Sequence, residues 1–172
     1  METLVLARHG ESDLSARGIA NGDPARACVL TDAGRVQARR LAELIARDRF
    51  DLYVTSAFTR TQETADLALA GRDVPRLVVP ELNDIRFGDF ESGAFDDYRA
   101  WARSASPTDV PPGDGESRAT CVARYVLNAL ESRPPQPILD QVPYAEPFRL
   151  SADELAGAVD RLEAWAASPA WT

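Results

Sequence analysis

The sequence has no lysine, a single histidine and two cysteines among its 172 residues. Because lysine is absent, all 19 basic residues are arginines, and Schiff-base and other lysine chemistry is excluded. Cys28 and Cys121 lie far apart and fit no paired ligand spacing, which predicts reduced, incidental thiols. One histidine and no thiolate pair argue against a metal centre, so we expect no metal and no cofactor.

Long hydrophobic runs and an excess of positive charge are also absent. No apolar run approaches the roughly 18 residues of a membrane span, and no basic, apolar leader precedes residue 4. The net charge of −8 weighs against nucleic acid and anionic membranes as partners, because both favour a basic face. We therefore expect a cytoplasmic protein with one domain over residues 1–172, and its oligomeric state stays open.

The chain begins with an apolar run that ends in charged and polar residues. Residues 4–7 are apolar and partly β-branched, which predicts a buried strand, and Arg8, His9 and Gly10 follow directly. Ligands bind at the carboxyl ends of strands in open α/β sheets. Arginine suits phosphate oxygens, and a neutral imidazole is a competent nucleophile near pH 7. The pattern predicts a phosphate site with a histidine nucleophile.

Strand and helix patterns alternate through the first half of the chain. Residues 52–56 and 77–79 have the composition of strands, and residues 31–48 show helical periodicity after an N-cap signal. A second helix is predicted to begin near Thr59. That helix places Arg60 in its first turn, where backbone N–H groups favour an anion. The order predicts an α/β protein with a mostly parallel sheet.

The connecting segments differ in composition. Residues 9–30 are rich in Gly, Asp, Asn and Ser and are predicted to form an irregular binding loop. Residues 104–117 are rich in Pro and Gly, which predicts a surface loop or lid.

The second half is predicted to contain short helices. One covers residues 95–103, another residues 118–130, and edge structure follows at residues 138–150. The buried stripe of the first of these helices consists of Phe95, Tyr98 and Trp101. Ser151 caps a last helix, whose apolar face carries Leu155, Val159, Leu162 and Trp165.

Several of these segments together resemble the histidine phosphatase superfamily, the phosphoglycerate mutase-like proteins. An Arg-His-Gly tripeptide alone would indicate little, but the motifs occur in that family's order across residues 1–117. The motifs are Arg8-His9-Gly10-Glu11-Ser12, Leu30-Thr31-Asp32-Ala33-Gly34, Thr55-Ser56-Ala57-Phe58-Thr59-Arg60-Thr61-Gln62-Glu63-Thr64-Ala65, Leu82-Asn83-Asp84-Ile85-Arg86-Phe87-Gly88-Asp89-Phe90-Glu91 and Gly115-Glu116-Ser117.

The resemblance implies a three-layer α/β sandwich, with helices on both faces of a mostly parallel central sheet, and a phosphohistidine intermediate. By position, His9 would be the nucleophile, and Arg8 and Arg60 would bind the transferring phosphoryl group of a small phosphorylated molecule. Asp84 stands where the family has its proton donor. Neighbouring acids of the same stretch are alternatives, namely Asp89, Glu91, Asp96 and Asp97.

Further substrate contacts follow from the same resemblance. Ser15 occupies the position at which small-molecule members often carry an asparagine, and Arg86 follows the acidic motif. Both are candidate substrate contacts, and Arg17 and Arg118 are weaker ones. Arg8 beside His9 should keep the imidazole neutral, because a second adjacent cation is disfavoured.

The chain departs from the family at one central point. The family carries a second histidine on a strand near its carboxyl end, whereas this sequence has only His9. That strand is missing as well, because residues 118–135 run from one helix pattern directly into the next. We therefore predict that the sequence as given omits a segment between about residues 118 and 137, and a natural deletion is the alternative.

The function that this pattern predicts is phosphomonoester hydrolysis through a phosphohistidine on His9. A phosphoglycerate mutase-type phosphotransferase is one alternative. The other is a non-catalytic phosphate-binding or scaffold protein of the same fold, in which the two arginines bind anions without turnover.

Overall fold

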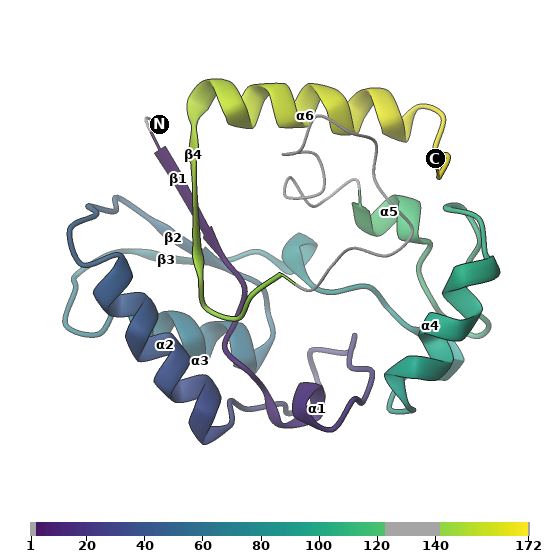
Figure 1. Ribbon diagram of the computed structural model, residues 1–172, viewed down its shortest axis with the longest axis horizontal. Coiled ribbons are helices and arrows are strands. Elements are labelled where there is room, and N and C mark those ends of the chain that lie inside the picture. The colour runs from purple at the N-terminus through teal and green to yellow at the C-terminus, as the bar shows by residue number, and fades with distance from the viewer. Residues whose placement is uncertain (1–2, 123–141, 172) are drawn as a thin grey trace.

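The computed structural model describes residues 3–122 and 142–171 and shows a mixed α/β arrangement (Figure 1). The first strand, β1, covers Thr3–Ala7, one residue earlier than the apolar run suggested. It pairs antiparallel with β4, Pro147–Ser151, from Thr3 opposite Ser151 to Ala7 opposite Pro147. The edge structure predicted near residue 150 is thus a strand that joins the two ends of the chain.

A second pair of strands is parallel. β2 covers Tyr53–Thr55 and β3 covers Arg76–Val78, with Tyr53 opposite Arg76. The helix α3, Thr59–Ala68, connects them, so the β-α-β order predicted from the sequence is confirmed. Within the described residues, this pair and the β1–β4 pair form two separate ladders.

Two helices pack together beside the strands (Figure 1). α2 covers Asp32–Leu44 and begins as predicted, because the Thr31 hydroxyl accepts the Gly34 N–H at 3.0 Å. It ends four residues before the predicted Asp48, where the chain continues as a turn. One buried cluster joins α2, α3 and the segment directly before β4. Its buried members are Leu41, Ile45, Ala68 and Ala145, and Val5, Phe50 and Leu69 pack against it.

A second buried cluster includes residues of the loop after β3, residues 79–94, which is rich in acidic residues. α4, Phe95–Ser104, contributes Tyr98 and Ala102, and the predicted aromatic stripe packs here. The preceding loop contains two 3-10 turns, η1 at Pro80–Leu82 and η2 at Gly88–Phe90. The buried members of the cluster are Ala20, Ile85, Phe87, Tyr98 and Ala102. This packing fixes the loop that carries Asp84.

Two loop predictions were wrong in part. Residues 9–30 contain a short helix, α1 at Asp13–Ala16, because the Ser12 hydroxyl caps its first turn. Residues 104–117 do not stand free as a lid. Pro111 is buried, Asp89 N–H donates to Pro112 O at 2.7 Å, and Glu116 N–H donates to Arg86 O at 2.9 Å.

The last helix begins as expected and buries a different face. α6 covers Ala152–Ala166, and Ser151 and Glu154 form a reciprocal capping box. Its buried residues are Ala158 and Leu162, while Val159 is 37% exposed, so the predicted stripe is wrong at that position. The buried face of α6 therefore contains Ala158 in place of the adjacent Val159.

The predicted omission falls mainly on residues 123–141, which lie outside the described residues, as does most of the helix expected over residues 118–130. Only α5, Arg118–Val122, is described there. The single-domain interpretation and the missing strand therefore stay predictions.

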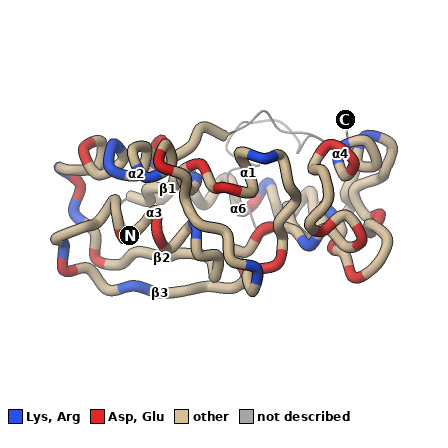
Figure 2. The backbone as a smooth tube through the Cα atoms, turned by 90° about the horizontal axis from the view of Figure 1, so that it is seen from below, with Lys and Arg blue, Asp and Glu red and all other residues tan. Residues whose placement is uncertain are grey.

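Over the described ranges, no helix is both long and apolar enough to cross a membrane. Acidic and basic residues are interspersed along the backbone (Figure 2).

Candidate functional site

The hydrogen bonds of His9 define its tautomer. The residue follows β1, and its Nδ1 lies 2.7 Å from the carbonyl oxygen of Gly10, which can only accept. On the other side of the ring, Arg60 Nε lies 3.2 Å from Nε2 and can only donate. The proton must therefore be on Nδ1, and Nε2 carries the lone pair. A nucleophilic nitrogen faces a guanidinium group.

Burial and neighbouring charge keep this imidazole neutral. Desolvation is the largest cause and the Arg60 charge the next, with a smaller contribution from Arg8, and together they lower the pKa of His9 to about 3. The Gly10 carbonyl opposes them, because it stabilises the protonated ring. The sequence predicted the effect of Arg8, but Arg60 and burial contribute more.

Close backbone packing sets the position of the Gly10 carbonyl. A Cβ on Gly10 would lie 2.4 Å from Gly34 O, and one on Gly34 would lie 2.0 Å from Glu11 O. Both contacts are with backbone, so neither position accepts a side chain without movement. In addition, Gly10 N–H donates to the Thr64 hydroxyl at 3.0 Å. The loop after β1 is therefore held against the start of α2 and the middle of α3.

Arg60 enters the site from the first turn of α3 and is only 4% exposed. Its Nη1 donates to the Asn21 side-chain oxygen at 2.5 Å and its Nη2 to the Asn21 carbonyl at 3.3 Å. The guanidinium carbon also lies 3.8 Å from the centre of the Phe58 ring. These contacts orient a buried cation whose nearest carboxylate, that of Asp84, is 3.5 Å from Nη2. A buried guanidinium group of this kind favours an anionic ligand.

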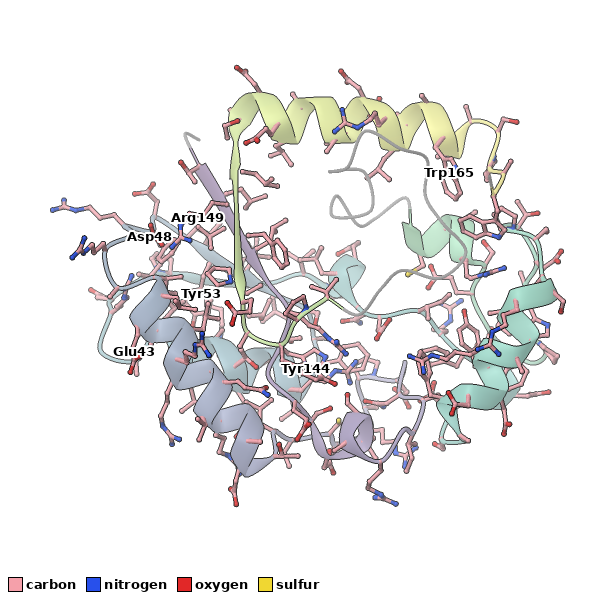
Figure 3. The ribbon with its side chains drawn as sticks, viewed as in Figure 1. Glu43, Asp48, Tyr53, Tyr144, Arg149 and Trp165 are labelled. Carbon is pink, nitrogen blue, oxygen red and sulfur yellow. The ribbon has the colours of Figure 1, made fainter. Side chains whose placement is uncertain are left out.

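Arg8 is held by residues from the other end of the chain. Its Nη1 donates to the Val142 carbonyl at 2.9 Å, and its guanidinium carbon lies 4.0 Å from the centre of the Tyr144 ring. Tyr144 precedes β4 and lies near the middle of the molecule (Figure 3). Its ring centre is 5.9 Å from that of His9. The segment before β4 therefore forms one wall of the site.

These groups surround a cavity of about 110 Å³. The polar residues of its lining include Arg8, His9, Arg60 and Asp84, whose side chain is half exposed. Apolar side chains complete the lining of the cavity. The residues that line it are Arg8, His9, Leu14, Ser15, Gly18, Ile19, Ala20, Asn21, Cys28, Arg60, Asp84, Phe87, Phe95 and Tyr144. The structure thus brings together four predicted residues: Arg8, His9, Arg60 and Asp84.

The other candidate residues differ in whether they line the cavity. Ser15 lines the cavity, and its hydroxyl lies 2.8 Å from that of Ser12. Arg86 is not among the lining residues, and its exposed side chain donates to the Asp114 carbonyl at 3.4 Å, so its role as a substrate contact stays a prediction. The alternative acids of the loop are likewise not among the lining residues. Across the described part of the chain, no cluster of three or more His, Cys, Asp or Glu could hold a metal ion.

Three residues of the site were missed from the sequence. Thr64 follows Arg60 by four positions, so helical spacing could have placed it beneath that arginine, where its hydroxyl donates to the Arg60 carbonyl at 2.7 Å. Asn21 and Tyr144 carry no comparable signal. Their contacts cross long stretches of chain, which local spacing does not encode.

Comparison with known proteins identifies the family to which the chain belongs. A profile of the histidine phosphatase superfamily (branch 1) matches residues 4–137. The chain is 37% identical over 140 residues to an adenosylcobalamin/alpha-ribazole phosphatase of Salmonella typhimurium, covering 75% of this chain and 67% of that protein. It is 38% identical over 139 residues to a 2,3-bisphosphoglycerate-dependent phosphoglycerate mutase of Methylobacterium sp., covering 72% and 64%.

A solved structure shows the same likeness. The alpha-ribazole phosphatase from Shigella flexneri is 33% identical, with a TM-score of 0.62 over 71% of this chain and 62% of that one. The chain spans about two thirds of the length of the curated relatives that it matches. It belongs to the histidine phosphatase superfamily and has the phosphoglycerate mutase-like α/β fold of that family.

Proposed function

We propose that this protein hydrolyses a small phosphomonoester through a phosphohistidine on Nε2 of His9. The observation that carries the proposal is the pairing of a neutral imidazole, protonated on Nδ1, with the buried guanidinium of Arg60 at its other nitrogen. Without a bound phosphate, the Arg60 Nε–H donates to the lone pair of His9 Nε2. A bound phosphate takes over the guanidinium donors and leaves that lone pair free to attack phosphorus.

The first step then balances within the residues of the cavity. Nε2 forms a bond to phosphorus as the bond from phosphorus to the leaving oxygen breaks, and Asp84 in its protonated form gives that oxygen its proton. The imidazole gains positive charge, which the Gly10 carbonyl stabilises through the Nδ1–H bond. Arg8 and Arg60 stabilise the phosphoryl oxygens.

The second step reverses the roles. Water attacks the phosphorus of phosphohistidine, the Asp84 carboxylate takes the proton of that water, and neutral His9 is released. A half-exposed carboxyl 3.5 Å from Arg60 can reach both the leaving oxygen and solvent. The apolar side chains that line the cavity, among them Leu14, Phe87 and Phe95, support an organic leaving group.

A simple assay tests the proposal. The protein should hydrolyse an aryl phosphate, and the His9→Ala variant should lose at least about a thousandfold in rate, since a covalent nucleophile has no substitute. A His9→Ala variant as active as the parent would overturn it. Cys121→Ala, outside the cavity, is the control and should retain full activity.

Two alternatives have their own supporting observations. A mutase relative of 38% identity favours phosphotransfer between phosphoglycerates, which would appear as exchange of phosphate between positions rather than release of inorganic phosphate. The single histidine of the sequence favours phosphate binding without turnover. In that case orthovanadate and inorganic phosphate would bind, yet no phosphomonoester would be consumed.

A further inference from the structure

We propose that Tyr144 is a positioning residue of the phosphate site: its ring holds the guanidinium of Arg8 in the orientation that binds the phosphoryl group. The proposal rests on the proposed function only in taking the anion to be a phosphate. Tyr144 lies beyond residues 4–137, the part of the chain that the family profile matches. Its role is therefore read from contacts in this chain alone.

Three contacts tie the segment around Tyr144 to Arg8. The ring lies 4.0 Å from the guanidinium carbon, which is the distance of a cation–π contact. Arg8 and Tyr144 form an isolated parallel β-bridge, and Ala145 N–H donates to the Arg8 carbonyl at 3.0 Å. Val142 O accepts from Arg8 Nη1 at 2.9 Å. Both the backbone and the side chain of Arg8 are thus held by one short segment.

The backbone at this point is unusual in a way that fits the role. Ala145 has a φ of 51°, in the left-handed region that residues with a Cβ rarely adopt, and it is only 2% exposed. It packs in the cluster formed by Leu41, Ile45 and Ala68. The core therefore fixes Ala145 in a costly conformation. The preceding residue, Tyr144, lines the cavity beside Arg8.

The ring, rather than the hydroxyl, carries the proposed role. A cation–π contact needs an aromatic face, and Phe supplies one as Tyr does. Without the ring, the Val142 carbonyl would be the remaining partner of the Arg8 guanidinium among residues 3–122 and 142–171. More rotamers would then be open to the side chain, and each would have to be given up when phosphate binds.

Phosphate affinity is the readout that tests this role, measured by calorimetry with inorganic phosphate and with orthovanadate. Tyr144→Leu should weaken binding by about 3- to 30-fold, the range of a partly desolvated cation–π contact. Tyr144→Phe should restore binding to within about twofold, since the aromatic face is kept. Tyr53→Leu in β2 is the matched control, because Tyr53 lies away from the cavity (Figure 3).

A double-mutant cycle separates positioning from general loosening of the fold. In an Arg8→Gln background, Tyr144→Leu should change phosphate affinity by less than about twofold, because its effect acts through Arg8. An equal loss in both backgrounds would overturn the proposal, and so would full affinity in Tyr144→Leu. If Tyr144→Leu does not fold, pentafluorophenylalanine at position 144 keeps the ring volume and reverses the ring's electrostatic face, and it should weaken binding similarly.

The outcome does not depend on turnover. If the protein binds phosphate but hydrolyses nothing, the proposed function fails while the binding cycle still decides the role of Tyr144. If turnover is found and the cycle shows no coupling, the hydrolase proposal stands and the Tyr144 proposal is wrong. Absence of phosphate binding in the parent protein would overturn the Tyr144 proposal directly.

Discussion

At the residue scale, the central feature is one imidazole whose two nitrogens have different partners. The Gly10 carbonyl fixes the proton on Nδ1, and the Arg60 guanidinium faces the lone pair of Nε2. Arg60 in turn is oriented by Asn21, and the loop by Thr64. These hydrogen bonds thus hold His9 with its proton on Nδ1 and its lone pair on Nε2, the form of the imidazole that can act as a nucleophile.

Because the sequence contains one histidine, its protonation can be followed by NMR without overlap. The ring resonances of His9 should remain those of the Nδ1–H tautomer from neutral pH to about pH 4, because the pKa of His9 is lowered to about 3. In the urea-unfolded chain the same resonances should titrate near pH 6.5. A folded-state midpoint between pH 6 and 7 would contradict the described burial and charge around the ring.

The role of Asp84 can be tested through the leaving group. In a single-turnover measurement of phosphohistidine formation, Asp84→Asn should slow transfer from an alkyl phosphate by about 10²- to 10⁴-fold, because a poor leaving oxygen needs a proton. A nitrophenyl phosphate, whose leaving group departs as an anion, should be slowed far less. Asp97→Asn is the control, an exposed acid outside the cavity. Equal losses for the two substrates would show that Asp84 is not the proton donor.

At the element scale, local signals were sufficient for most helices and strands. Thr31 and Ser151 cap α2 and α6 as their sequences predict, because capping depends on neighbouring residues only. The β1–β4 pairing could not be predicted, since it joins residues from opposite ends of the chain. The contact of Tyr144 with Arg8 has the same origin. Sequence reasoning therefore found the charged residues of the site and missed the partners that orient them.

The close packing of the β1 loop on α2 gives an element-scale prediction. Gly34→Ala should destabilise the protein by about 2–4 kcal/mol and reduce activity, because its Cβ would meet Glu11 O at 2.0 Å. Gly157→Ala, also within a helix, should stabilise it by about 0.5–1 kcal/mol, since its Cβ meets only the flexible end of Arg161. Urea unfolding measures both. Similar changes for both variants would contradict the packing described.

At the scale of the whole molecule, burial of neutral His9 links stability to pH. The native pKa lies below the unfolded value, so between about pH 3 and 6.5 the unfolded chain binds the extra proton. This contribution is complete above pH 6.5 and is lost progressively as pH falls toward 3. The parent protein should therefore lose about 1–2 kcal/mol more stability than His9→Gln between pH 7.5 and 5. Urea midpoints at the two pH values measure this, and parallel losses would contradict it.

Arg8, which follows β1, and Tyr144, which precedes β4, meet at the site, and its cavity is lined by two arginines although the chain has a net charge of −8. An acidic protein can bind an anion in this way because the buried Arg60 and the partly buried Arg8 act at short range, whereas exposed charges are screened beyond about 10 Å. The fold thus places two arginines at one cavity, while acidic and basic residues are interspersed along the backbone (Figure 2).

The most direct test of the central claim is to identify the phosphorylated residue. The protein is mixed with an aryl phosphate, quenched in alkali to preserve phosphohistidine, digested and mapped by mass spectrometry. We predict a phosphoryl group on His9 that is stable in alkali, lost in acid and absent from His9→Ala. A phosphoryl group on any other residue, or labelling that persists in His9→Ala, would contradict the account.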